Sequence, residues 1–328
     1  MWNPRANIFH WGALLKVLTA FAIGLTLAGL LSAAQAQNAR SFVSGHGLDT
    51  NACTLAAPCR TLAAALSATN PSGEIDVLDP AGYGSLTITK AISIVNDGVG
   101  TAGVIVPSGG IGITISAGTN DAVSLRGLSI EGAGVGQTGI KFNAGKSLTV
   151  ENCVIRHMTL DGIDFVSTTV TSALTVSNSL IADNLGAGIF LYPTGSATAV
   201  FNRVEANNNG SHGIMVDGTN SAGTNTINAT VSESVAAGNS GGAGFFSVSN
   251  SGKAPTSLMV YHSVAANNSD GVAAAGPGAT LRLANSTVTG NGNGWAVPTA
   301  GGVLYSYGDN YIDGNVSGES APPSIARK

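Results

Sequence analysis

Charged residues that could transfer a proton occur in two consecutive stretches that repeat one another. Residues 148–163 read LTVENCVIRHMTLDGI, and residues 174–189 read LTVSNSLIADNLGAGI, so the frame recurs after 26 residues with the charged residues exchanged. Aligning Ile155, Ile181 and Val204 in three successive units predicts one outer surface where charges lie about 5 to 10 Å apart, because neighbouring strands are about 4.8 Å apart. The charged residues just past these anchors are Arg156, His157, Asp183 and Glu205.

This constellation has two interpretations. A histidine beside a carboxylate is a usable general base, so the four residues are catalytic candidates. The alternative is that they are solvated turn residues, whose exposed ion pairs contribute under about 1 kcal/mol each. A similar alignment of the Gly-Ile turns stacks Asp161, Ala187 and His212 in successive units.

Aromatic residues indicate a ligand-binding surface rather than a catalytic site. An outward aromatic ring can pack against the apolar face of a pyranose ring. Trp295 follows Gly294 in a position where other units carry Ile or Val, which favours the core. The candidate ligand-binding residues are therefore Tyr192, Tyr305 and Tyr307.

Cysteines give the next constraint. Cys53 and Cys59 are separated by five residues in NACTLAAPCR, and a local disulfide is predicted for a chain routed to an oxidising compartment. A metal pair is the alternative, but no histidine or second cysteine pair lies close in the sequence. Cys153 is left over, and its place in the repeat indicates a small buried residue rather than a nucleophile.

The elements that must position these residues are short strands. β-branched anchors recur at intervals of 23 to 31 residues, at Ile130, Ile155, Ile181, Val204, Val235, Val264, Val288 and Ile312. Within a unit the apolar residues alternate, as Leu148 and Val150 do, which is the period of a strand with one buried face. The links are rich in Gly, Asn and Ser and leave no room for a crossover helix, so the units are expected to stack as coils of a parallel β-solenoid.

Asparagine recurs a few residues past the anchors, which predicts a ladder of turn-forming side chains in adjacent coils. The predicted members are Asn184, Asn207, Asn239, Asn268, Asn291 and Asn315.

The two ends of the chain differ from the repeats. The segment TLAAALSAT has helical composition and follows the predicted disulfide loop, so both are expected to cap the open amino-terminal end of the solenoid. The predicted organisation is a signal peptide over 1–36, a cap over 37–75, the solenoid over 76–316 and a carboxy-terminal tail over 317–328.

The first 36 residues have the composition of an export signal. Arg5 and Lys16 precede the 15-residue apolar run VLTAFAIGLTLAGLL, and Ala34 and Ala36 form a small-x-small cleavage site. An uncleaved anchor is the alternative, but the run falls short of the roughly 20 residues that a spanning helix needs. We expect cleavage after Ala36 and a secreted or periplasmic protein with no membrane span.

Composition narrows the class of partner. The net charge of −4 disfavours nucleic acid and anionic membranes as the main partner. Charged residues make up only 10% of the chain, while glycine numbers 45, which suits a β-rich exported protein that turns often.

The chain resembles a known family in three features: FVSGHGLDTNACTLAAPCRTLAAAL, then GEIDVLDPAGYGSLTITKAISI, then units of the form V.N..I..N...GI. They resemble the right-handed parallel β-helix proteins of the pectin-lyase-like superfamily, and more narrowly its small exported bacterial members. The resemblance covers about residues 40–316 and implies the right-handed sense of the solenoid. That superfamily contains pectate lyases, polygalacturonases, pectin methylesterases, phage tailspikes and structural proteins.

The resemblance also implies acidic polysaccharide as the default substrate class. The superfamily's lyases pair calcium-binding carboxylates with a basic residue, and its hydrolases use clustered aspartates. The strings NTD, DD and RxPxxR do not occur in this sequence, so no catalytic residue is transferred. Neither metal nor cofactor is expected, and calcium is the alternative, although no motif supports it.

The sequence therefore predicts an all-β, single-domain right-handed parallel β-helix of about nine or ten coils. The first functional hypothesis is a non-catalytic module that binds polysaccharide or another cell-surface ligand. The second is a polysaccharide lyase or glycoside hydrolase acting on acidic glycans through Arg156, His157, Asp183 and Glu205. Convergence of these four residues on a groove would favour the enzyme.

Overall fold

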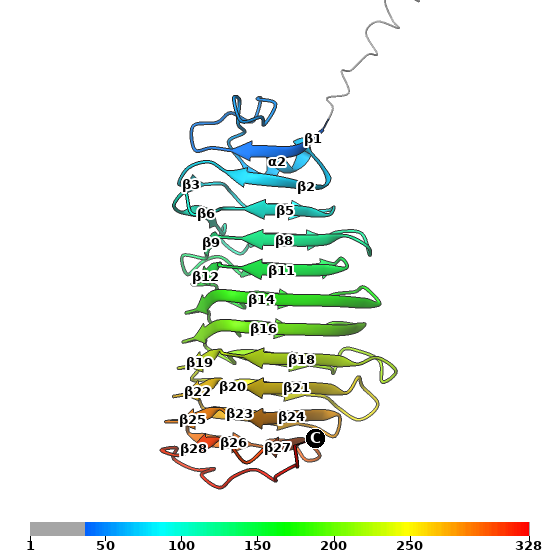
Figure 1. The fold of residues 1–328 in the computed structure, drawn as a ribbon, viewed down its shortest axis with the longest axis vertical. Coiled ribbons are helices and arrows are strands. Elements are labelled where there is room, and N and C mark those ends of the chain that lie inside the picture. The colour runs from blue at the N-terminus through cyan, green and yellow to red at the C-terminus, as the bar shows by residue number, and fades with distance from the viewer. Residues whose placement is uncertain (1–36, 328) are drawn as a thin grey trace, which may run out of the picture. The chain divides into compact units, whose positions relative to one another are not determined.

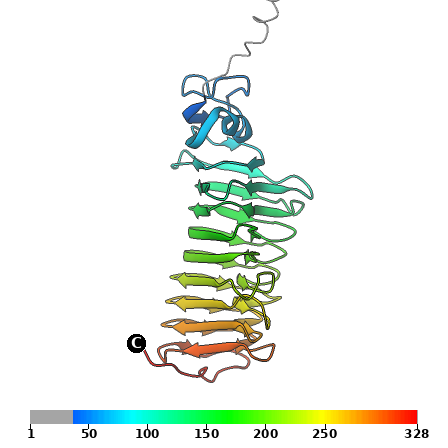
Figure 2. The ribbon, with the colours of Figure 1, turned by 90° about the vertical axis from the view of Figure 1, so that its right-hand side faces the viewer.

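The computed structural model describes residues 37–327, and the predicted signal peptide lies outside them. The described chain folds into a 19-stranded sheet and a 9-stranded sheet, whose strands pair in parallel. Figures 1 and 2 show the strands following one another along a single axis. None of the described helices is long and apolar enough to cross a membrane.

The 19-stranded sheet has two wings, which are continuous through β14 and β16. The long wing, stacked at the centre of Figure 1, contains β1 (Asn38–Val43), β2 (Thr69–Val77), β5 (Ile92–Val95), β8 (Ala122–Arg126), β11 (Ser147–Glu151), the first parts of β14 (Thr171–Ala182) and β16 (Ser196–Asn207), β18 (Ile227–Ser232), β21 (Thr256–Tyr261), β24 (Ala279–Ala284) and β27 (Val303–Ser306). The short wing contains β3 (Ala81–Gly82), β6 (Ala102–Ile105), β9 (Leu128–Glu131), β12 (Val154–Arg156), the last parts of β14 and β16, β19 (Val235–Ala237), β22 (Val264–Ala266), β25 (Thr287–Thr289) and β28 (Tyr311–Ile312).

The nine-stranded sheet closes each coil. Its strands are β4 (Leu86–Ile88), β7 (Ile111–Ser116), β10 (Thr138–Ala144), β13 (Ile163–Phe165), β15 (Ile189–Leu191), β17 (Ile214–Asp217), β20 (Ala243–Val248), β23 (Asp270–Ala275) and β26 (Asn293–Ala296). One coil runs through this sheet, the long wing and the short wing in turn. Because this sheet supplies one strand to each coil, the chain makes about nine turns, and the predicted parallel solenoid is confirmed.

The core lies inside the coils and follows the period of two. Along β11, Leu148 and Val150 are buried while Thr149 faces outward. Identical inward positions stack from coil to coil, as in Phe142 and Phe165, whose ring centroids lie 4.4 Å apart. The interior is therefore a set of side-chain columns that only the stack can bury.

An asparagine ladder lines the turn between the short wing and the nine-stranded sheet. Each side-chain amide donates to the side-chain oxygen of its counterpart in the next coil at 2.8 to 3.0 Å, through Asn184, Asn209, Asn239, Asn268, Asn291 and Asn315. The predicted ladder is confirmed except for one member. The sequence prediction of Asn207 was wrong, and Asn209 takes that place.

The register of the same coil explains why Asn207 was predicted in place of Asn209. The register pairs Ile181 with Ala206, and the inward column continues through Ala236 and Ala265. The β-branched anchors predicted in these three coils, Val204, Val235 and Val264, were therefore wrong by one or two residues. Small alanines fill the inward corner there, and their carbonyls accept hydrogen bonds from ladder amides, as Ala206 does from Asn239 at 3.0 Å.

The amino-terminal cap is confirmed. Cys53 and Cys59 form a disulfide in the loop that covers the free edge of β1, where Phe42 N–H donates to the Cys53 carbonyl at 2.8 Å. Helix α2 (Leu62–Ala68) begins at Thr61, whose hydroxyl accepts from Ala64 N–H, and it packs against β1, β2 and β4. The edge that could template aggregation is thereby covered.

The carboxy-terminal segment lies along the last coil. Ser317 forms a bridge with Asn293, and Ser324 forms one with Ser306. The indole of Trp295 packs against the core as predicted, and its N–H donates to the Ser320 carbonyl at 2.6 Å. This segment covers edges of the terminal strands.

The ladder makes a stability prediction. Asn239→Ala removes the oxygen that accepts from the Asn209 main-chain N–H and side-chain amide, and it removes the amide that donates to Asn268 and to the Ala206 carbonyl. All four hydrogen bonds lie in a buried site, so we expect a loss of about 2 to 3 kcal/mol in the free energy of unfolding. Asn220→Ala, at an exposed turn, serves as the control and should change stability by under about 0.5 kcal/mol. Urea denaturation followed by circular dichroism measures both, and equal effects would contradict the structural role of the ladder.

Candidate functional site

The corner between the long and short wings is built from single residues in the left-handed backbone region. Their φ values run from 45° to 71°, and they are Gly127, Asn152, Asn178, Arg203, Glu233, His262 and Asn285. This conformation turns the chain within one residue, and Asn accepts it more readily than most side chains. Their side chains therefore point outward and repeat at steps of about 4.8 Å along the axis.

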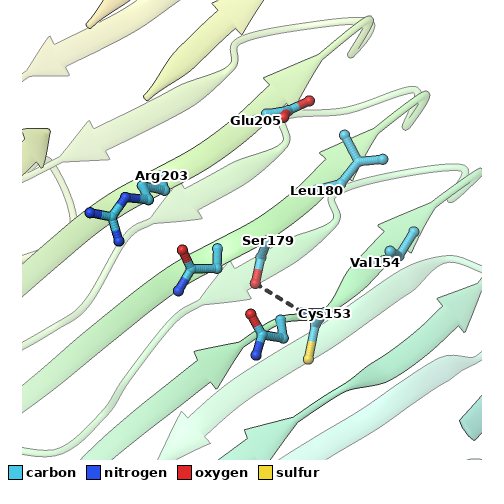
Figure 3. A pocket seen from close by; sticks show the side chains of 8 residues that line it. Cys153, Val154, Ser179, Leu180, Arg203 and Glu205 are labelled. Atoms are coloured by element: carbon cyan, nitrogen blue, oxygen red, sulfur yellow. Dashed lines mark hydrogen bonds between the residues drawn. The ribbon is translucent and has the colours of Figure 1, made fainter. Parts of the chain in front are cut away.

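The residue that follows the corner is buried, and its N–H is satisfied by the next coil. Cys153 N–H donates to the Ser179 hydroxyl at 3.1 Å (Figure 3), and Ser234 and Ser263 repeat the contact with Ser263 and Ser286. Burial raises the pKa of the Cys153 thiol to about 11. Cys153 is thus a buried thiol, as the sequence predicted.

Three hollows follow this corner, and together we call them the corner groove. The first, of about 400 Å³, is lined by Asn96, Asp97, Gly98, Arg126, Gly127 and Asn152. The second, of about 390 Å³, is drawn in Figure 3 and is lined by Asn152, Cys153, Val154, Asn178, Ser179, Leu180, Arg203 and Glu205. The third, of about 710 Å³, is lined by Met259, Tyr261, Ala284, Asn285, Tyr307, Asp309 and Arg327.

The third hollow has a tyrosine on either side of an alanine. Register places Tyr261 beside Ala284, and Tyr307 directly follows Ser306, the partner of Leu283. The two tyrosines therefore lie about 10 Å apart, two strand steps, with only a methyl group between them. Tyr261 is 47% exposed, so its ring is available to a ligand.

Polar groups complete this hollow. Asp309 accepts a hydrogen bond from Asn285 N–H at 3.0 Å and pairs with Arg327. The Asn285 N–H, together with the nearby Arg327 guanidinium, holds the pKa of Asp309 below its usual value. The hollow thus combines two aromatic rings with an ionised carboxylate and a largely exposed guanidinium.

Three of the four predicted charged residues lie together at the end of the short wing. Arg156 Nε donates to Glu131 Oε2 at 2.9 Å, His157 Nδ1 lies 2.7 Å from Glu131 Oε1, and His157 Nε2 lies 4.0 Å from Asp183. Burial raises the pKa of Glu131, but hydrogen bonds from Ala133 N–H, His157 and Arg156 outweigh it and leave the pKa lowered. Glu131 was missed, although aligning Ile130 with Ile155 places it beside Arg156.

These residues line none of the three hollows. Their side chains remain 44% to 46% exposed for Arg156, His157 and Asp183. At that exposure each ion pair contributes under about 1 kcal/mol.

Glu205 lies apart from them. The register pairs Leu180 with Glu205 and Ala182 with Asn207. The predicted column of Arg156, Ala182 and Glu205 was therefore wrong, because Ala206 rather than Val204 continues the inward column. Glu205 lines the second hollow of the corner groove.

The three predicted tyrosines lie at separate places on the surface. Tyr307 lines the third hollow, and Tyr305 lies beside Arg282 on the outer surface of the long wing. Tyr192 follows the nine-stranded sheet's β15 and stacks on Phe190 with ring centroids 5.0 Å apart. Tyr261 was not among the predicted residues, because only the strand register places it near Tyr307.

A second group of charges lies on the outer surface of the nine-stranded sheet. Lys141 Nζ is 3.0 Å from Asp164 Oδ2, and Asp161 Oδ1 accepts from Ala187 N–H at 2.6 Å. Burial raises the pKa of Asp161 to about 6, with a further rise from Asp164 and opposition from the Ala187 N–H. The predicted stacking of Asp161, Ala187 and His212 agrees with the register of β13, β15 and β17.

Residues 37–327 contain no cluster of side chains suited to ligating a metal ion. No group of three or more His, Cys, Asp or Glu side chains there is placed to hold a metal ion.

Comparison with known proteins identifies the class of fold. Residues 85–234 match the family model described as "Right handed beta helix region". A pectate lyase, Pel9A, has a solved structure that superposes with a TM-score of 0.63 at 17% identity, over 88% of this chain and 78% of that one. The chain therefore has the right-handed β-helix, pectin-lyase-like fold, and the predicted hand is confirmed.

A second solved structure is more distant. The A-module of the mannuronan C-5 epimerase AlgE4 from Azotobacter vinelandii aligns over 79% of this chain and 90% of that one, with 14% identity and a TM-score of 0.40. No curated protein sequence matched the chain.

The raised pKa of Asp161 predicts a pH dependence. Its pKa is about 6 in the folded protein against 3.8 ordinarily, so between pH 4 and 6 the folded state keeps a proton that the unfolded chain releases. Stability contributed by Asp161 therefore falls as pH rises through this window, by on the order of 3 kcal/mol, and stays constant above it. Asp161→Asn should remove this slope, as urea titrations from pH 4 to 7 would show.

Asp313→Asn, at an exposed position of the last coil, is the matched control and should keep the wild-type slope. A constant stability difference between wild type and Asp161→Asn across the window would contradict the assignment.

Proposed function

We propose that this protein is an exported glycan-binding module whose corner groove holds an extended polysaccharide. The observation that carries the proposal is the third hollow, where Tyr261 and Tyr307 stand on either side of Ala284. Tyrosine offers an apolar ring and a polar hydroxyl, which match the apolar face and the hydroxyl groups of a pyranose. Asn285, Asp309 and Arg327 add hydrogen-bonding groups around the same space.

The alignment of three hollows along one corner of the coils favours a polymer over a small sugar. The first two hollows share Asn152, and the corner column continues through Arg203, Glu233 and His262 to the third hollow. From Asn96 to Gly308 this column makes eight steps, about 38 Å. The fold similarity to a pectate lyase adds polysaccharide as a ligand class by analogy.

An enzyme acting on acidic glycans is the second candidate. The contact of His157 with Glu131 favours it, because a carboxylate on Nδ1 orients the ring and leaves Nε2 to take a proton. Two observations stand against it: Glu205 is separated from this cluster, and no member of the cluster lines any of the three hollows.

Export forms part of the proposal. The Cys53–Cys59 disulfide suits an oxidising compartment, and the residues up to Ala36 have the composition of a signal peptide. Sequencing the amino terminus of the protein recovered from outside the cytoplasm should give Gln37 as the first residue.

A glycan array followed by calorimetry on the bound glycan tests the binding function. Tyr261→Ala and Tyr307→Ala should each weaken affinity five- to tenfold, since each removes a stacking contact of about 1 to 1.4 kcal/mol. Tyr311→Ala is the matched control, because this tyrosine is exposed in the last coil but does not line the hollow. Binding of no glycan, or equal losses in all three variants, would overturn the assignment.

Product assays on the same glycan distinguish a binding module from an enzyme. We expect binding without unsaturated products or new reducing ends, and His157→Ala should leave affinity unchanged. Product formation that disappears in His157→Ala and Asp183→Ala would replace the binding module with a catalyst.

A further inference from the structure

Each of the three hollows of the corner groove is lined by one arginine and one carboxylate. The pairs are Arg126 with Asp97, Arg203 with Glu205 and Arg327 with Asp309. No other charged side chain of the described residues lines any of these hollows. The formal charge of the lining is therefore zero in every hollow.

In the first and third hollows the two charges form an ion pair. Arg126 Nη1 lies 3.4 Å from Asp97 Oδ1, and Arg327 Nη2 pairs with Asp309 Oδ2. The two arginine side chains are 45% and 68% exposed, so each guanidinium can still donate to a ligand. Because a carboxylate stands beside each guanidinium, a carboxylate of the ligand placed there would be repelled.

The second hollow separates its two charges. Arg203 and Glu205 flank the buried Val204 and both line the hollow (Figure 3). Arg203 Nε donates to Glu233 Oε2 of the next coil at 2.9 Å, so this arginine also has a carboxylate partner. A polyuronate in the groove would therefore meet at least one fixed negative charge for each positive one.

Sugar hydroxyl groups match such paired charges. A hydroxyl can accept from a guanidinium and donate to a carboxylate, so two neighbouring hydroxyls can use both members of a pair. Hydrogen bonds to ionised groups are stronger than those between neutral groups. Asn152 in the second hollow and Asn285 in the third add amides, which both donate and accept.

We propose that the corner groove selects uncharged glycan chains, and that Asp97, Glu205 and Asp309 exclude uronates by balancing the arginines. This inference rests on the proposed glycan-binding function and names its ligand class, which differs from the acidic polysaccharide that the family resemblance implies. The net charge of −4 acts in the same direction, because it repels a polyanion.

Calorimetry with hexamers of different charge tests the ligand class in the purified protein. The probes are uncharged glucan, mannan and galactan hexamers, an anionic galacturonate hexamer and a cationic glucosamine hexamer. We expect one of the uncharged hexamers to bind at least tenfold more tightly than either charged one at pH 7. Raising the salt from about 20 mM to about 0.5 M should change its Kd less than twofold, because it carries no charge to be screened.

Removing a carboxylate tests its role in specificity. Asp97→Asn leaves Arg126 unbalanced at nearly constant shape, so it should strengthen binding of the galacturonate hexamer at least threefold at low salt. Asp309→Asn should do the same in the third hollow, and thermal unfolding would verify that both variants fold. Asp313→Asn is the matched control, because it removes an equal charge from an exposed position that lines no hollow, and it should leave every affinity unchanged.

The outcomes separate this inference from the proposed function. Tightest binding of a charged hexamer, or a galacturonate affinity that neither Asp97→Asn nor Asp309→Asn raises, would overturn the uncharged ligand class and leave glycan binding intact. A preference for an uncharged hexamer that Tyr261→Ala does not weaken would instead overturn the assignment of the glycan to the third hollow. Binding of none of the hexamers would overturn the glycan-binding function itself, and this inference with it.

Discussion

Main-chain hydrogen bonding between successive coils is the constraint on which this structure depends. A single coil can neither pair its strands nor bury its inner side chains, so each coil must match the next in register. Chain length between equivalent positions varies, with 30 residues from Ala206 to Ala236 but 23 from Ala265 to Val288. Strand pairing is kept in both intervals, and the additional residues lie in turns such as the one between β17 and β18.

The corners of the coil satisfy the same constraint with side chains. Where the backbone turns away from its neighbour, asparagine amides take over the hydrogen bonding at one corner, and serine hydroxyls do so at the other. Both ladders are buried, so the loss of any one hydrogen bond would leave a polar group without a partner in an apolar interior. This explains why a chain so poor in charge carries so many small polar residues.

Outward side chains are free of this requirement, so their presence alone does not indicate a function. The Arg203 and Glu233 pair on the corner is exposed and contributes little to stability. Convergence is the more informative property, because a ligand needs several groups around one space. The hollow between Tyr261 and Tyr307 shows it, since aromatic rings, a carboxylate and a guanidinium surround one space there.

The amino-acid sequence alone determined the class of fold. Alternating residues such as Leu148 and Val150, the recurring Gly-Ile turns and the absence of crossover helices were enough to predict a parallel solenoid. Local spacing likewise predicted the Cys53–Cys59 disulfide and the capping helix, because both are formed within a few residues.

Only the tertiary structure decided which residues share a column. A strand that slips by two residues keeps the same side chains inward and outward, so alternation cannot distinguish Val204 from Ala206 as the inward anchor. Packing of the whole coil places Ala206 in the inward column. Glu205 therefore lies away from Arg156, and Asn209 rather than Asn207 belongs to the ladder. The placement of Tyr261 and Tyr307 on either side of Ala284 depends on register in the same way, because these residues are distant in sequence and share one hollow only through strand pairing.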